Sequence, residues 1–141
     1  MFGLLAALAY GTSSFFVKLS TSDKHFGVSQ PVFMLLMLIG IAIVFVANTM
    51  TSNGLALPSD PFAIGACIAA GILWGLGMVF VVLALSGGAD LSRLVPIFNT
   101  NTLVAVILGI LVLGELPSSP DKLHVIAGAL MIITGSVLVS S

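Results

Sequence analysis

Charged residues are scarce in this sequence, and their scarcity argues against a soluble fold. Only four lysines and arginines and five aspartates and glutamates occur among 141 residues, 6% of the chain, whereas a soluble domain carries roughly 25%. So few charged side chains cannot cover the surface of a soluble globule of this size. The net charge of −1 also provides no basic surface that would attract nucleic acid. We therefore expect neither a soluble protein nor a nucleic-acid partner.

Residues that commonly bind metals or act as nucleophiles are equally few. Cys67, the single cysteine, lies in an apolar run and cannot form an intrachain disulfide, so we interpret it as a small helix-packing residue. His25 and His124 stand near the ends of expected helices, far apart in the sequence. No nucleophile–base motif and no glycine-rich phosphate loop is present. The sequence therefore predicts no metal site, no cofactor and no enzymatic centre.

Long hydrophobic runs make up most of what remains. Hydrophobic residues are 59% of the chain, and the mean hydropathy is +1.27. Crossing the bilayer core takes about 20 helical residues, and the runs do not alternate as barrel strands do. The predicted spans are Met1–Leu19, Pro31–Met50, Pro61–Leu85, Ser92–Leu113 and Lys122–Val139. We predict an all-α integral membrane protein with five transmembrane helices.

Proline and glycine mark the ends of these segments. Pro31, Pro61 and Pro120 each stand near the first turn of an expected helix, where the missing N–H of proline costs little. The connections between segments are short, so no soluble domain fits between them. Any function must therefore reside in the membrane or in these short loops.

Polar side chains inside the first span form a candidate site. Tyr10, Ser14 and Lys18 recur at intervals of four residues and so share one helix face. Polar groups are costly in lipid and usually face protein or a water-filled cavity. We interpret this face as a cavity wall whose lysine binds an anionic group or a proton-linked partner. An alternative is that Lys18 lies close enough to the helix end to extend its ammonium to the headgroups.

The third span combines close-packing signals with a central tryptophan. Gly71 and Gly75 form a GxxxG pair, which allows helix backbones to approach closely. Trp74 lies near the middle of the span instead of at the membrane interface, where tryptophan is usual. Its indole N–H needs a partner there. Trp74 therefore lines a cavity or packs in the helix bundle.

The fourth span contains a proline followed by four consecutive polar residues. Pro96 cannot donate to the Ser92 carbonyl, so we expect the helix to be loosened or kinked there. Asn99 and Asn101 follow, pointing in nearly opposite directions on a helix. They are candidates for substrate contact, and the alternative is interhelical hydrogen bonding, worth about 0.6–2 kcal/mol per contact.

Glu115 follows the fourth span in the sequence Leu113-Gly114-Glu115. The helix dipole disfavours a carboxylate at a helix C-terminus. Its presence suggests a second role, either pairing with a basic residue or capping the next helix. We expect an exposed interfacial position in preference to a proton-coupling role.

Several short elements match a known family pattern. These are Ala9–Ser14 with Lys18, Arg93–Pro96, Leu113–Glu115, Gly128 and Gly135. Together they resemble the EamA-like domain of the drug/metabolite transporter superfamily. In the first helix of that domain an aromatic-Gly-Ser/Thr element precedes a lysine. The resemblance covers nearly the whole chain, although each element is weak alone.

The resemblance implies half of a ten-helix transporter fold, a single EamA-like transmembrane domain over residues 1–141. Familiar members carry two such domains in one chain, and these resemble an inverted repeat around a central cavity. One domain needs a partner to enclose that cavity, so we expect a homodimer. An antiparallel arrangement is compatible with a weak orientation bias. The bias is Lys18, Lys24 and Arg93 on one side of the membrane against Lys122 on the other.

The function implied by the resemblance is secondary transport of small metabolites by alternating access, in the plasma membrane of a prokaryote. We expect the substrate-binding residues to be Tyr10, Ser14, Lys18, Trp74, Asn99 and Asn101. Pro96 would supply helix flexibility. Because no carboxylate lies in mid-helix, we expect facilitated exchange or a role for Lys18. A non-transporting or heteromeric membrane subunit and a lipid-linked sugar flippase remain as alternatives.

Overall fold

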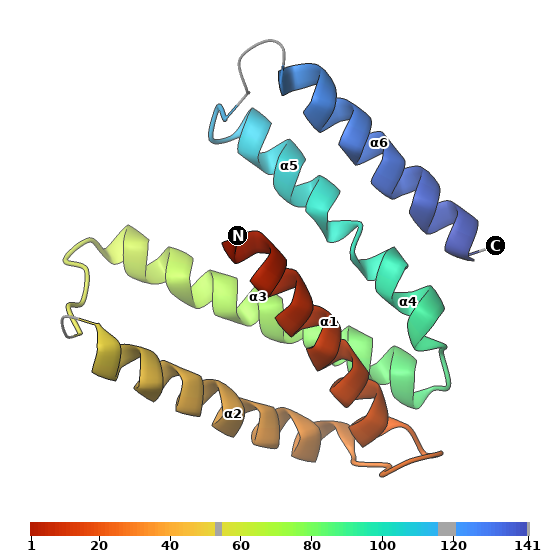
Figure 1. Ribbon diagram of the computed structural model, residues 1–141. Coiled ribbons are helices and arrows are strands. Elements are labelled where there is room, and N and C mark those ends of the chain that lie inside the picture. The colour runs from red at the N-terminus through yellow and green to blue at the C-terminus, as the bar shows by residue number, and fades with distance from the viewer. Residues whose placement is uncertain (53–54, 116–120, 141) are drawn as a thin grey trace. The chain divides into compact units, whose positions relative to one another are not determined.

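The computed structural model describes residues 1–52, 55–115 and 121–140, and the regular structure of these residues is entirely α-helical (Figure 1). The helices are α1 (Phe2–Thr21), α2 (Gln30–Thr51), α3 (Pro61–Ser86), α4 (Leu91–Phe98), α5 (Asn101–Leu111) and α6 (Asp121–Ser140). Their ends fall close to the predicted ones, except that the fourth predicted span divides into α4 and α5. The all-α prediction is confirmed.

Among the described residues, four helical stretches are long and apolar enough to cross a membrane. They are α1, α2, α3 and the stretch Leu91–Leu111, which combines α4 and α5. The apolar part of α6, Leu123–Val139, is shorter. The chain is therefore a multi-pass membrane protein by helix length and composition, and the fifth span stays a prediction.

Local sequence signals explain where the helices begin. The Asp60 side chain accepts a hydrogen bond from the Phe62 N–H at 2.9 Å and so caps the start of α3. Pro31 and Pro61 lie in the first turns of α2 and α3, as the sequence predicts. Pro120, which the sequence places before the last helix, lies outside the described residues.

The chain forms two compact units, Met1–Gly88 and Ala89–Ser141, which are described one at a time. In the first unit α1 packs chiefly on α3, and α2 makes smaller contacts with both. Its buried side chains belong to the C-terminal parts of α1 and α3 and to the residue that follows α1: Val17, Thr21, Ser22, Val82 and Leu85. Most large apolar side chains elsewhere are exposed, which suits surfaces that lipid or other helices cover.

In the second unit α6 packs along α4. The sequence predicts a loosened or kinked helix at Pro96. In the structure Pro96 lies inside α4, which ends two residues later at Phe98, and Asn99 and Thr100 separate α4 from α5. The backbone there forms hydrogen bonds of the 3₁₀ type. The Thr100 N–H donates to the Ile97 carbonyl at 3.2 Å, and the Leu103 N–H donates to the Thr100 carbonyl at 2.9 Å.

Threonine hydroxyls contribute to this break in the fourth span. Thr100 Oγ1 donates to the Ile97 carbonyl at 2.6 Å, and Thr102 Oγ1 donates to the Asn99 carbonyl at 2.9 Å. Such side-chain bonds compete with the regular helical ladder. The polar run after the proline, together with the N–H that Pro96 lacks, therefore divides the span.

Candidate functional site

The first group of candidate residues lies on α1. Ser14 donates its hydroxyl hydrogen bond to the Tyr10 carbonyl at 3.0 Å, one turn back on the same helix. Tyr10 is 67% exposed, whereas Ser14 and Lys18 are half-buried. The shared face predicted from the sequence thus runs from an exposed phenol to a partly covered ammonium.

Lys18 connects this face to the end of α3. Its Nζ donates to the Leu85 carbonyl at 3.2 Å, in a partly buried position. Carbonyls in the last turn of a helix lack intrahelical donors, and the helix dipole favours a cation there. Lys18 therefore binds protein backbone as well as being a candidate for substrate contact.

Of the candidate residues on α3, Gly71 and Trp74 are exposed and Gly75 is half-buried. Trp74 is 44% exposed. A Cβ built on Gly71 or Gly75 meets no described atom within 4 Å. The close helix packing predicted for the two glycines is therefore not made within this unit, and it stays a prediction for contact with a helix outside the unit.

In the second unit, the break between α4 and α5 exposes both candidate amides. Asn99 and Asn101 are exposed on either side of Thr100. A bilayer contains no water to satisfy irregular backbone, so such a break persists where it lines a cavity or is covered by protein. The break therefore stays a candidate position for a polar ligand in the fourth span.

Ser136 on α6 is a functional candidate that sequence reasoning missed. It is 8% exposed, and its hydroxyl lies 3.0 Å from the Pro96 carbonyl and 2.7 Å from the Ile132 carbonyl. One hydroxyl proton is therefore shared between a carbonyl of α4 and one of its own helix. Only its place next to Gly135 in an apolar helix could have drawn attention to it.

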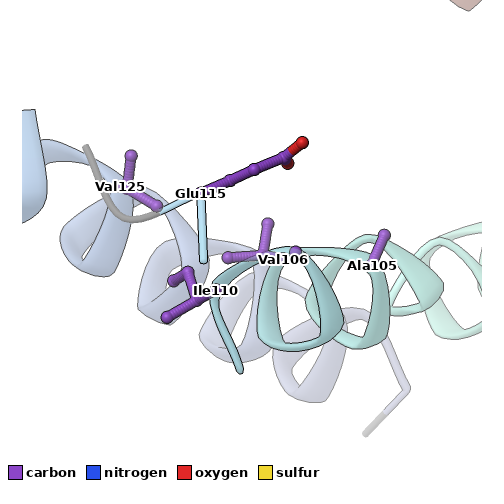
Figure 2. A pocket seen from close by; sticks show the side chains of 6 residues that line it. Ala105, Val106, Ile110, Glu115 and Val125 are labelled. Atoms are coloured by element: carbon purple, nitrogen blue, oxygen red, sulfur yellow. The ribbon is translucent and has the colours of Figure 1, made fainter. Parts of the chain in front are cut away.

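Glu115 lies where the chain leaves α5. Gly114 adopts a φ of +68°, which favours glycine, and the Glu115 N–H then donates to the Gly109 carbonyl at 3.0 Å. Glu115 is exposed, as predicted. Its side chain nevertheless extends back along α5, as Figure 2 shows, instead of continuing past the helix end. The carboxylate and the neighbouring helices form a shallow pocket of about 340 Å³.

The candidate residues fall into two groups, one in each unit. Tyr10, Ser14, Lys18 and Trp74 belong to the first unit. Asn99 and Asn101 belong to the second, as does Pro96. Their assembly into one binding site stays a prediction.

Comparisons with known proteins bear on the class of function. No family model and no solved structure matches the chain. The chain is 27% identical to a "putative sugar uptake protein" of Streptococcus pyogenes serotype M1 over 105 residues, which cover 74% of this chain and 36% of that protein. A "putative sugar uptake protein" of Streptococcus agalactiae serotype V is 32% identical over 68 residues, 48% of this chain and 23% of that relative.

The chain thus spans about a third (36%) of the length of the first of these curated relatives. The resemblance to EamA-like domains rests on the sequence elements alone. The chain is a multi-pass membrane protein with a distant similarity to bacterial proteins whose names point to transport and not to catalysis.

Proposed function

We propose that this protein is a secondary transporter of small hydroxylated solutes, with sugars as the first class to test. The observation that carries the proposal is the break between α4 and α5, where irregular backbone and amide side chains interrupt an apolar span. Discontinuous helices of this kind form solute sites in transporters. The names of the streptococcal relatives supply the sugar class.

The chemistry of the candidate residues suits such a solute. The amides of Asn99 and Asn101 each offer donors and an acceptor to sugar hydroxyls. Tyr10 and Trp74 offer aromatic faces and one polar group each. Ser14 and Lys18 add polar groups on the α1 face. In this proposal, two copies of the protein, each with five membrane spans, enclose a cavity, and the solute binds there among these six side chains. The cavity opens in turn to one side of the membrane and then to the other.

Replacing the two amides tests the site. We expect Asn99→Ala and Asn101→Ala each to reduce sugar uptake into proteoliposomes strongly, because a buried solute hydroxyl would lose its partner. Asn48→Ala is the matched control, since this exposed amide lies in the last turn of α2, outside the proposed site. Uptake equal to wild type in both site variants would overturn the assignment of the break as the binding site.

The proposed dimer is tested separately by membrane topology. We expect native mass spectrometry to give a dimer and a C-terminal cysteine tag to be labelled from both sides of the membrane, as an antiparallel homodimer requires. The background cysteine is removed first by Cys67→Ala. Labelling from one side only would rule out the antiparallel dimer and favour a parallel oligomer or a heteromeric subunit.

A further inference from the structure

The Glu115 pocket, defined by Ala105, Val106, Gly109, Ile110, Glu115 and Val125, holds a carboxylate against an apolar helix surface (Figure 2). Its Oε2 lies 3.2 Å from the position that a Cβ on Gly109 would occupy. Gly109 is in the last turns of α5, and Ala105 and Val106 lie one turn deeper in the span Leu91–Leu111. The side chain thus brings the carboxylate back beside the last turn of the apolar span, although the Glu115 backbone lies beyond the helix.

The surroundings of this carboxylate favour its binding a cation. An ionised carboxylate beside apolar groups and lipid is costly unless it is paired or neutralised. The other five residues that line the pocket carry no side-chain oxygen. A metal ion bound by oxygen needs several such ligands. A proton needs only the carboxylate itself.

We infer that Glu115 is the proton-binding group that couples solute transport to the proton gradient, an inference that rests on the proposed transport function. The carboxylate accepts a proton from water at one side of the membrane, forming an O–H bond. It releases the same proton to water at the other side of the membrane when the cavity opens to that side. No other reactant is required, and the direction of solute movement follows the proton gradient.

The described parts of the two helices that line the pocket carry few other titratable residues. No residue of α5, from Asn101 to Leu111, titrates. α6, which supplies Val125, carries Asp121, Lys122 and His124 in its first turn. His124 directly precedes Val125 and carries an imidazole, a common acid–base group. A test of Glu115 must therefore separate its effect from that of His124.

The test compares accumulation with exchange in proteoliposomes. We expect Glu115→Gln, which keeps the shape of the side chain but cannot titrate, to lose sugar accumulation driven by a pH gradient. Exchange of labelled for unlabelled sugar without a gradient should persist in this variant. Two controls should retain accumulation: Asp90→Asn, an exposed carboxylate that makes no side-chain cap on α4, and His124→Gln.

The outcomes distinguish the inference from the proposed function. Absence of both accumulation and exchange in the wild-type protein, across a panel of sugars, would overturn the transport proposal itself. Exchange in the wild type together with undiminished accumulation by Glu115→Gln would overturn the coupling role alone. Accumulation that follows a sodium gradient at constant pH would also overturn it, because the proton would not be the coupled ion.

Gly109→Ala provides a second, geometric test. The added methyl group would lie 3.2 Å from Oε2, so the end of the flexible Glu115 side chain must shift by a few tenths of an ångström while the backbone stays in place. We expect reduced gradient-driven accumulation with exchange retained. Gly128→Ala is the matched control, because its added Cβ meets no described atom within 4 Å. Identical accumulation by the two glycine variants would contradict the proposed position of the carboxylate.

Discussion

Replacing Pro96 with alanine should stabilise the protein and impair transport at the same time. Proline in a helix interior is about 3 kcal/mol less favourable than alanine. Pro96 lies inside α4, and alanine restores a donor for the Ser92 carbonyl. The gain in the free energy of unfolding should approach but not exceed that value, because the helix has already adapted to the ring.

The loss of transport in this variant would follow from a stiffer α4. The Pro96 carbonyl is held by the Ser136 hydroxyl at 3.0 Å, and the same hydroxyl has an acceptor in its own helix, the Ile132 carbonyl, at 2.7 Å. The hydroxyl can therefore release Pro96 without losing all its bonds. We expect Pro96→Ala to slow uptake because a regular helix moves less readily beside this contact.

Thermal unfolding in detergent and uptake in proteoliposomes measure the two effects. Pro31→Ala is the control, since Pro31 lies in the first turn of α2, where proline lacks no required donor. It should change neither property appreciably. A lower melting temperature for Pro96→Ala, or uptake at the wild-type rate, would contradict the role assigned to the proline.

Replacing Lys18 with methionine should destabilise the first unit. The variant loses the hydrogen bond from Nζ to the Leu85 carbonyl, 3.2 Å long and partly buried. That carbonyl keeps a weaker bond from the Gly88 N–H at 3.3 Å, so the expected loss is about 1–2 kcal/mol. Leu85 itself is fully buried, and the loosened contact therefore lies in the small core of this unit.

The control for this variant is Lys24→Met, because Lys24 is exposed in the turn after α1. We expect Lys18→Met alone to lower the melting temperature in the absence of substrate. Uptake per folded molecule should also fall if Lys18 lines the cavity as proposed. Unchanged stability would contradict the structural role, and unchanged uptake at every pH would remove Lys18 from the transport site.

Much of the fold could be predicted because helix formation in an apolar segment depends on local sequence. The ends of α2 and α3 follow from Pro31, Pro61 and the Asp60 cap, which act within a few residues. In lipid every backbone N–H and C=O must find a partner within the protein, so a long apolar run forms a helix. The position of the break in the fourth span was less well predicted. Pro96 removes a donor to the Ser92 carbonyl, whereas the threonine hydroxyls bond to the Ile97 and Asn99 carbonyls, one turn later.

The candidate site was predicted only in part. The sequence identified Asn99 and Asn101 as polar residues in an apolar span, and the structure exposes them at a helix break. It did not identify Ser136, whose significance depends on the Pro96 carbonyl 40 residues away. Residues so distant in the chain carry no local pattern that marks them as partners.

The sequence by itself determined that the chain is helical, apolar and suited to a membrane, since these properties follow from composition and from runs of neighbouring residues. Tertiary structure alone decided that Lys18 contacts Leu85, 67 residues away. It also decided that Ser136 contacts the Pro96 carbonyl, 40 residues away, because the packing of α6 along α4 brings the two together. Contacts between distant segments depend on the folded arrangement of helices, which local sequence patterns do not specify.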